Sequence, residues 1–284
     1  MPVVNPTIIM AAGKGSRMKA RADLPPEVLL EASARPKAMI RIGKARKPLL
    51  AYILQQLASE GCTGACVVIA EDDTITPAHF NRHPIDRLEV SFVRQAIPAG
   101  RTKPLGTAHA VQLALEAHPA WAAHSVTVGN GDNLAPRGMF RALFAHPAAL
   151  PAFHPNHLGL PKKRIRAFAV IHTDEVGRFE AITEKPSVAE MAEAQWTDGQ
   201  VRVSMNYFRM PCEQLLQAVK TVPEHPVRKE RELPVAISRW ARMEGGKMKA
   251  LPMAGSFLDL THPEDIVKAG EIIDSGGFAL KERT

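Results

Sequence analysis

The apolar positions in the first half of the chain predict short buried strands that alternate with helices. The run at residues 8–11 is followed by glycines and predicts a buried parallel strand that opens into a tight loop. Apolar residues between 48 and 61 recur at helical spacing, and a glycine ends this helix. Further strands are predicted at 65–70, 88–93 and 125–128, and a further helix at 107–118. This order predicts an α/β fold with a mostly parallel sheet.

The second half of the chain is richer in β-strand patterns. Two β-rich runs, 165–173 and 178–182, predict a hairpin across the polar residues between them. A further strand is predicted at 201–210, and helices are predicted at 211–219, 233–243 and 262–275. The change of character near residue 150 divides the chain into two halves.

Composition narrows the class of partner. The net charge of +7 favours anionic ligands, but only 5% of the residues are aromatic and the basic residues are scattered, which argues against nucleic acid. Phosphorylated small molecules fit better. The three cysteines, Cys62, Cys66 and Cys212, form no Cys-x-x-Cys pair and indicate reduced thiols of a cytoplasmic protein, and we expect Cys62 and Cys66 to be buried. We expect neither a signal peptide nor a membrane span, because no apolar run approaches about 20 residues.

The loop after the first strand carries the strongest chemical signal. It reads AAGKGSR at residues 11–17, and its small residues let backbone N–H groups approach an anion closely. Lys14 and Arg17 add positive charge, and Arg17 can bind a phosphate through two parallel hydrogen bonds. The spacing excludes a P-loop, and Met18 stands where a dinucleotide fingerprint needs its third glycine. The loop predicts a polyphosphate site, with an ordinary strand-to-helix turn as the alternative.

Other candidate residues remain ambiguous when each is taken alone. Lys37 precedes a strand-like run and either reaches over the same site or is a solvated surface charge. Thr107 follows Gly106 at a predicted helix N-terminus, where it is a candidate cap. Asp132 ends a buried strand, where it is either a ligand for a hard cation or an Asx-turn residue. His109 lies in the helix predicted at 107–118, where we expect it to have a packing role.

The order of the motifs adds information that no single motif carries. Between residues 7 and 265 the chain contains AAGKGSRM, RPKAMI, PLLAYIL, PLGTAHAV, NGDN, EKP, SMNYF and FLDLTHPED. In this order they resemble the sugar-1-phosphate nucleotidyltransferases, also called NDP-sugar pyrophosphorylases. The resemblance implies a Rossmann-like mixed, mostly parallel central sheet with flanking helices and a small β-rich sugar-binding part. It also implies one domain, 1–284, with a nucleotide-binding half, 1–150, and a sugar-binding half, 151–284.

The resemblance further implies an activity and a set of site residues. The family joins a nucleoside triphosphate to a sugar 1-phosphate by in-line attack on the α-phosphorus, which releases pyrophosphate. By this resemblance the nucleotide is bound by Ala11, Ala12, Gly13, Lys14, Gly15, Ser16, Gln95, Gly106 and Thr107. Arg17, Lys37 and Lys185 are the implied catalytic residues, and Glu184, Lys185 and Asn206 bind the sugar phosphate. Asp132 and Asp259 are the implied ligands of a shared Mg²⁺.

Several alternatives stay open at this level. A catalytically silent nucleotide-sugar sensor on the same fold is one, and a metal-dependent glycosyltransferase is another. The latter is expected to show Asp-x-Asp at the metal strand, where this chain has Asn130, Gly131 and Asp132. UTP or dTTP is the expected nucleotide, but users of CTP and GTP, and a cytidylyltransferase acting on a non-sugar phosphate, share these motifs. The sequence also leaves open a homo-oligomer.

Overall fold

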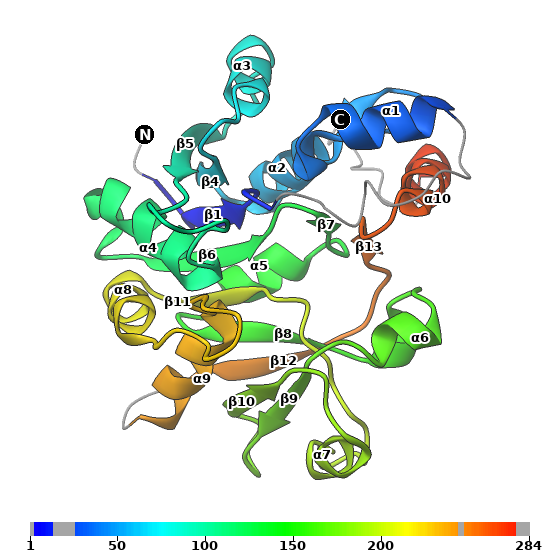
Figure 1. Cartoon of the computed structure of the whole chain (residues 1–284). Helices are drawn as coiled ribbons and strands as arrows, with labels where there is room; N and C mark the ends of the chain where they lie inside the picture. The colour runs from blue at the N-terminus through cyan, green and yellow to red at the C-terminus, as the bar shows by residue number, and fades with distance from the viewer. Residues whose placement is uncertain (1–2, 14–25, 244–246, 277–284) are drawn as a thin grey trace.

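The computed structural model describes residues 3–13, 26–243 and 247–276, and its centre is a seven-stranded sheet (Figure 1). The strand order is β12 (Lys249–Met253), β8 (Ala149–Phe153), β11 (Phe208–Pro211), β6 (Ser125–Asn130), β1 (Thr7–Met10), β4 (Gly64–Ala70) and β5 (Glu89–Gln95). β1 is parallel to β4 and β6, β4 to β5, and β8 to β12, whereas β11 is antiparallel to both of its neighbours. The expected mixed, mostly parallel α/β sheet is therefore confirmed.

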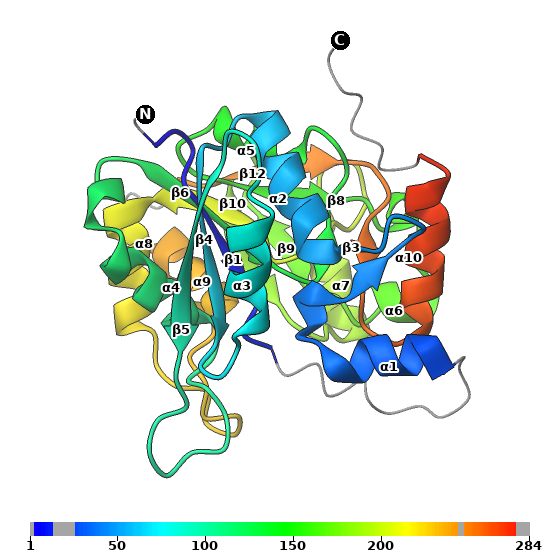
Figure 2. The same ribbon diagram turned by 90° about the horizontal axis from the view of Figure 1, so that it is seen from above.

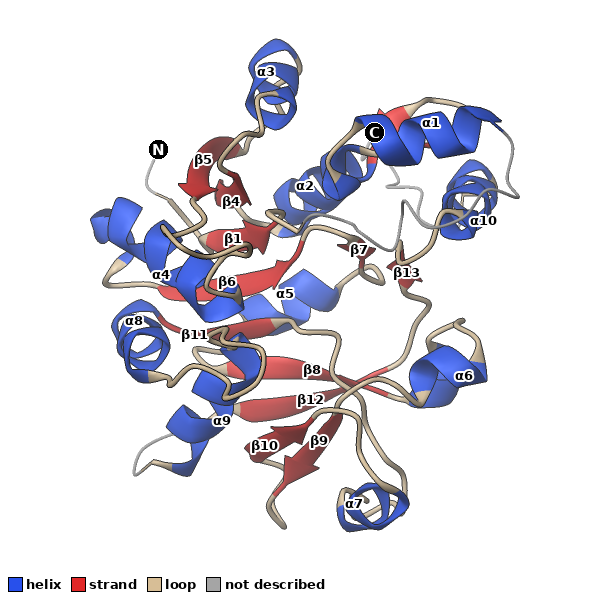
Figure 3. Ribbon diagram, viewed as in Figure 1, coloured by secondary structure: helices blue, strands red, loops and turns tan. Residues whose placement is uncertain are grey.

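Helices cover both faces of this sheet because successive strand residues point to opposite sides. In β1, Ile8 and Ile9 are both fully buried but belong to different apolar clusters. The Ile9 side packs against α2 (Leu49–Glu60) and α5 (Met139–Phe144). The Ile8 side packs against α4 (Thr107–Ala117), α8 (Cys212–Thr221) and α9 (Leu233–Arg242). Figure 3 shows these helices around the strands of the sheet.

The shorter elements lie around this frame, and Figure 2 shows α1 and α10 at the same end of the molecule. The helical elements are α1 (Pro26–Ala34), η2 (Lys37–Met39), α3 (Ile75–Arg82), η3 (Pro119–Trp121), η4 (Pro155–His157), α6 (Lys162–Ile165), α7 (Val188–Glu193) and α10 (Glu264–Asp274). Antiparallel pairs are formed by β2 (Arg41–Ile42) with β3 (Lys47–Pro48), β7 (Asn133–Leu134) with β13 (Leu258–Asp259), and β9 (Val170–Thr173) with β10 (Phe179–Thr183). Among the described helices, none combines the length and apolar character that a membrane crossing requires.

Two strand predictions in the second half are too long. The strand predicted at 165–173 begins only at Val170, because α6 ends at Ile165 and a tight turn follows it. The strand predicted at 201–210 is reduced to Phe208–Pro211, since Asn206 adopts a φ of 58° that strands do not accommodate. The predicted β9–β10 hairpin is confirmed, Cys62 and Cys66 are free and buried as expected, and Cys212 is free and buried as well.

Candidate functional site

A cavity of about 680 Å³ opens beyond the carboxyl end of β1 and collects most of the residues predicted from the sequence. Its lining includes Ala11, Ala12, Gly13, Lys37, Gln95, Gly106, Thr107, Asp132, Glu184 and Asn206. Lys185 and Asp259 are not among the described residues that line it. Lys14, Gly15, Ser16 and Arg17 lie outside the described residues. The cavity therefore joins predicted nucleotide-binding positions to predicted acceptor positions.

The ends of β1 and β6 line the cavity, and β4 pairs with β1 beside them. The Ala11 N–H donates to the Val68 carbonyl at 2.7 Å, and the Gly131 N–H donates to the Met10 carbonyl at 2.8 Å. A Cβ on Gly131 would lie 3.1 Å from the Ala11 Cβ, which leaves almost no room for a side chain there. The ends of β1 and β6 are thus held close together, and the start of the predicted phosphate loop lines the same cavity.

The turn at the start of α4 is fixed by a loop that lies more than 120 positions further along the chain. Gly106 has a φ of 95° and is the N-cap of α4. The Arg231 N–H donates to the Leu105 carbonyl at 2.7 Å, and the Ala108 N–H donates to the Arg231 carbonyl at 3.0 Å. Thr107 is the first helical residue rather than the predicted cap, and its Oγ1 accepts from the Leu233 N–H at 2.9 Å. The prediction of a Thr107 cap is wrong because Gly106 is the N-cap, so that Thr107 already lies inside the helix and its hydroxyl accepts from Leu233 instead.

Gln95 lies at the end of β5 beside this turn and is almost fully buried. Its Nε2 donates to the Gly106 carbonyl at 2.9 Å, which fixes the orientation of the amide at the cavity wall. The same Nε2 lies 3.4 Å from Nδ1 of His109. Burial and then the charge of Arg231 lower the pKa of His109, so this imidazole is neutral near pH 7. His109 thus packs behind Gln95, consistent with the expected packing role.

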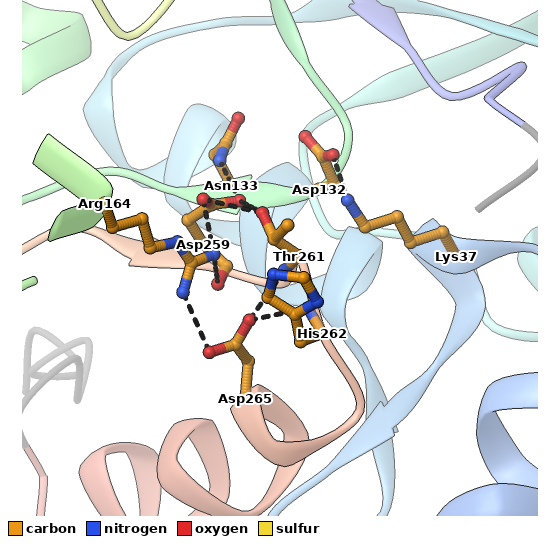
Figure 4. A network of polar contacts seen from close by, with 8 residues as sticks. All are labelled: Lys37, Asp132, Asn133, Arg164, Asp259, Thr261, His262 and Asp265. Carbon is orange, nitrogen blue, oxygen red and sulfur yellow. Dashed lines mark hydrogen bonds and ion pairs between the residues drawn. The ribbon is translucent and has the colours of Figure 1, made fainter. Parts of the chain in front are cut away.

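Lys37 and Asp132 form an ion pair at the centre of the cavity lining. Lys37 opens the short helix η2, and its Nζ lies 2.5 Å from Oδ2 of Asp132 (Figure 4). Both side chains are partly buried, with 15% of Lys37 and 31% of Asp132 exposed. A pair that is half screened from water holds its charges in a defined position while still facing a ligand. Of the two interpretations of Lys37, the one that places it over the site agrees with this geometry.

Asp259 lies on the strand beside Asp132, because β13 pairs with β7 and places Asp259 opposite Asn133. The Leu260 N–H also donates to the Asp132 carbonyl at 3.1 Å. The Asp259 carboxylate accepts from Asn133 Nδ2 at 3.0 Å, from Thr261 Oγ1 at 3.0 Å, and from Arg164 Nη2 at 2.6 Å (Figure 4). Burial and then the charge of Asp132 raise the pKa of Asp259, and this rise is limited by Arg164 and Lys37.

The two carboxylates differ in how well they fit a divalent metal ion, which nucleotidyltransferases of this kind generally use. Asp132 fits a metal ion, because it lines the cavity and Lys37 engages only its Oδ2, so that Oδ1 can act as a ligand. Asp259 does not fit in this arrangement, because three donors, one of them a guanidinium, already engage its oxygens. The described residues contain no group of three His, Cys, Asp or Glu side chains placed to hold a metal. A shared Mg²⁺ site stays a prediction.

The acceptor side of the cavity contains an ion-pair network that the sequence motifs did not indicate. Arg228 Nη2 lies 3.2 Å from Oε2 of Glu184, and Arg228 Nε lies 2.7 Å from Oε1 of Glu232. All three residues line the cavity. Burial raises the pKa of Glu232, an effect that Arg228 opposes. Lys185, with a φ of 49°, is exposed beside this network.

Arg164 and Arg228 are the residues at this site that the sequence analysis missed. Arg164 lies in the short helix α6 and Arg228 in a turn, both in polar stretches of the sequence without apolar periodicity, and both bind carboxylates that are remote in sequence. Arg164 is 95 positions from Asp259, and Arg228 is 44 positions from Glu184. One sequence contains no signal for such pairs, because only the folded chain brings them together.

Comparison with known proteins agrees with this geometry. The family model described as "Nucleotidyl transferase" matches residues 6–270. The chain belongs to the nucleotidyl transferase family. This confirms the family expected from the sequence motifs. The chain is also 27% identical over 191 residues to "Bifunctional protein GlmU" of Psychrobacter sp. (strain PRwf-1), a match that covers 66% of this chain and 34% of that protein.

Solved structures show the same fold. The crystal structure of HddC from Yersinia pseudotuberculosis is similar to this nucleotidyltransferase with a TM-score of 0.63 and 17% identity, over 95% of this chain and 100% of that chain. The structure of HddC complexed with GMP-PN gives a TM-score of 0.62 and 16% identity over the same shares. At these identities the likeness concerns the fold. The chain spans about a third of the length of its GlmU relative, so the activity of that whole protein is not transferred.

Proposed function

We propose that this nucleotidyltransferase joins a nucleoside triphosphate to a sugar 1-phosphate and releases an NDP-sugar and pyrophosphate. One observation carries the proposal: a single cavity is lined by the described members of the predicted nucleotide-binding set and by the predicted acceptor residues Glu184 and Asn206. Lys37 and Asp132 face the same cavity. A cavity of about 680 Å³ has the size typical of a small-molecule site.

The reaction needs positioning and charge neutralisation more than it needs a nucleophilic side chain. A phosphate oxygen of the acceptor attacks the α-phosphorus and forms a new P–O bond. The bond from the α-phosphorus to the bridging oxygen of the β-phosphate breaks, and its electron pair leaves with pyrophosphate. Both reactants are anions, so the protein must hold them in line and offset their repulsion.

The lining residues fit these two requirements. Ala12 and Gly13 lie at the end of β1 and present a backbone without bulky side chains to the triphosphate. Lys37 supplies a positive charge whose position is fixed by Asp132. A divalent cation held by Asp132 would neutralise phosphate charge when bound. The predicted role of Arg17 on the β- and γ-phosphates stays part of the proposal, as do those of Lys14, Gly15 and Ser16.

The two ends of the cavity would distinguish the substrates. Gln95, with its amide fixed by Gly106, would contact the base, and Glu184, Asn206 and Lys185 would contact the sugar phosphate. UTP or dTTP is the nucleotide we propose first. Because a similar structure is complexed with GMP-PN, GTP belongs in the same test.

The test is a pyrophosphate-release assay over a matrix of UTP, dTTP, CTP and GTP against sugar 1-phosphates with Mg²⁺. We expect turnover in at least one combination. Asp132→Asn should reduce that turnover by about 100-fold, because it removes a charge that orders the reacting groups. Asp72→Asn is the matched control, since Asp72 is exposed and is not among the described residues that line the cavity.

Two results would contradict the proposal. One is a folded protein that releases no pyrophosphate from any combination, and the other is an Asp132→Asn variant as active as Asp72→Asn. Nucleotide binding without pyrophosphate release would instead favour the silent sensor.

A further inference from the structure

Arg164 bridges two carboxylates that belong to different elements of the C-terminal part of the chain. Its Nη2 lies 2.6 Å from Oδ2 of Asp259, and its Nη1 lies 2.9 Å from Oδ1 of Asp265 (Figure 4). Nη2 also donates to the Asp259 carbonyl at 3.0 Å. The Arg164 side chain is only 17% exposed, so water weakens these contacts little. Arg164 is therefore an integral part of the structure around Asp259.

The second carboxylate of this bridge has a structural role of its own. Asp265 lies in the first turn of α10, and its Oδ2 accepts from the Thr261 and His262 N–H groups, both at 2.8 Å. Its other oxygen accepts from Arg164. Asp265 thereby fixes the turn after β13, and Arg164 ties that turn to the Asp259 carboxylate.

The charges around the two candidate metal ligands nearly balance without any metal. Asp132, Asp259 and Asp265 contribute three negative charges, and Lys37 and Arg164 contribute two positive ones. Within this described network one net negative charge remains. Cation affinity in oxygen sites rises with the number of ligand charges, so a site with most of its charge already neutralised binds a divalent ion weakly.

We propose that Arg164 is a built-in counter-ion for Asp259 that excludes a divalent cation from this carboxylate, so that the free protein binds metal through Asp132 alone. A divalent ion at Asp259 would have to displace or lie against a guanidinium that is held by two carboxylates and a carbonyl. The inference rests on the proposed function only in that the reaction uses a metal. Arg164 is a positioning residue, because it acts on the site only by holding the Asp259 carboxylate in place.

The experiment is a titration of the substrate-free protein with Mn²⁺, in which electron paramagnetic resonance reports the unbound ion. The variants are Asp132→Asn, Asp259→Asn, Arg164→Met and the double variant Arg164→Met/Asp259→Asn. Arg166→Met is the matched control, because Arg166 is an exposed arginine of the same segment. Thermal unfolding of each variant accompanies the titration, since Arg164→Met leaves two carboxylates without their counter-ion.

The expected pattern separates the two carboxylates. Asp132→Asn should weaken Mn²⁺ binding by about tenfold or more, whereas Asp259→Asn should change it by less than about threefold. Arg164→Met should tighten binding by about tenfold, because it frees Asp259 and adds a ligand charge. The double variant should lose this gain, and Arg166→Met should bind like the unchanged protein.

The comparison of Asp259→Asn with Asp132→Asn decides the inference even where Arg164→Met does not fold. Equal weakening by both variants would make Asp259 a ligand and overturn it. A folded Arg164→Met variant with unchanged Mn²⁺ affinity would overturn it as well. The Mn²⁺ titration needs no substrate. Its result can therefore contradict this inference without bearing on the proposed reaction, which the pyrophosphate assay tests separately.

Discussion

Gly106 occupies a position that no residue with a side chain fits. Its φ of 95° lies in the left-handed region that favours glycine, and a Cβ there would lie 2.5 Å from the Arg231 carbonyl oxygen. The neighbouring backbone is fixed, because Arg231 bonds to both Leu105 and Ala108. The close approach lets residues 105–108 join the loop around Arg231 and shape the wall of the cavity beside Gln95.

Gly106→Ala should therefore lower the free energy of unfolding by about 2–3 kcal/mol, through backbone strain together with the clash. Gly100→Ala is the matched control, because Gly100 has a φ of 78° but no described atom within 4 Å of the position that a Cβ would occupy. The control should lose only about 1 kcal/mol, the part that strain alone contributes. Urea unfolding of the two variants and the unchanged protein measures the difference. Equal losses would mean that the contact with Arg231 has no energetic importance.

At the scale of residues, the sequence indicates site positions that follow strand ends and misses those that pair across the fold. Asp132 follows the buried strand β6, whose apolar run is evident, so the topology of a parallel sheet predicts its place, whereas the role of Gln95 follows only from the resemblance to the family. Arg164 follows no such rule, and its partner Asp259 is 95 positions away. This changes the interpretation of Asp259. The sequence motif alone implies that Asp259 is a metal ligand, whereas in the folded chain its carboxylate is bound by Arg164.

At the scale of elements, one carboxylate anchors α1 to the β2–β3 hairpin. Glu31 of α1 is almost fully buried and accepts from Arg41 Nη2 at 2.9 Å, Arg46 Nη2 at 2.8 Å and Arg35 Nε at 3.0 Å. It also accepts from the Arg41 backbone N–H at 2.9 Å. Burial by itself would raise the pKa of Glu31, but the hydrogen bonds and charges of Arg41, with the charge of Arg35, hold this pKa below its ordinary value of 4.5.

Glu31→Gln should lower the free energy of unfolding at pH 7 by about 1–3 kcal/mol, because it leaves three arginines around a neutral amide. Since the folded pKa is depressed, the ionised carboxylate contributes its full stabilisation above pH 4.5 and loses it as the pH falls through the folded pKa. The difference between variant and unchanged protein should therefore shrink in acid. Denaturant unfolding at pH 7 and pH 3 measures it, with the exposed Glu175→Gln as control.

A difference that stays constant between these two pH values would show that the anchor is not electrostatic. Loss of stability in Glu175→Gln of the same size would show that the effect is not specific to Glu31.

Elements with clear periodicity are those that the sequence predicts well. In α2 the residues Leu50, Ile53, Leu54 and Leu57 are all buried, and Gly61 ends the helix with a φ of 108°. β11 is shorter than predicted because the run 201–210 contains Asn206, whose positive φ breaks the strand just where the residue lines the cavity. The local apolar pattern does not reveal this turn, in which the Asn206 N–H donates to Oγ of Ser204 at 3.1 Å.

At the scale of the whole molecule, the two halves of the chain share one sheet. β11, from the second half, lies between β6 and β8 and pairs with both. Val126 and Val128 of β6 and Phe208 and Met210 of β11 are all fully buried in the same apolar cluster. The predicted division into a nucleotide-binding and a sugar-binding half stays a prediction about function.

A fragment of residues 1–150 should accordingly fail to fold cooperatively. It keeps β1, β4, β5 and β6 but lacks the strand that pairs with the free edge of β6, and it exposes apolar residues that β11 and α8 cover. Circular dichroism during heating is the measurement, with the full chain as reference. A sharp thermal transition in the fragment, together with a native-like far-ultraviolet spectrum, would contradict the expectation.

The position of β11 also bears on the order of events during synthesis. A ribosome makes the chain from residue 1 onward, and the strand that closes the gap beside β6 is complete only at residue 211 of 284. Until then the nascent chain presents an open strand edge, which is where unfinished proteins associate with one another. A nascent chain that ends before residue 211 is therefore expected to associate through the edge of β6 more readily than a chain in which β11 has paired with that edge.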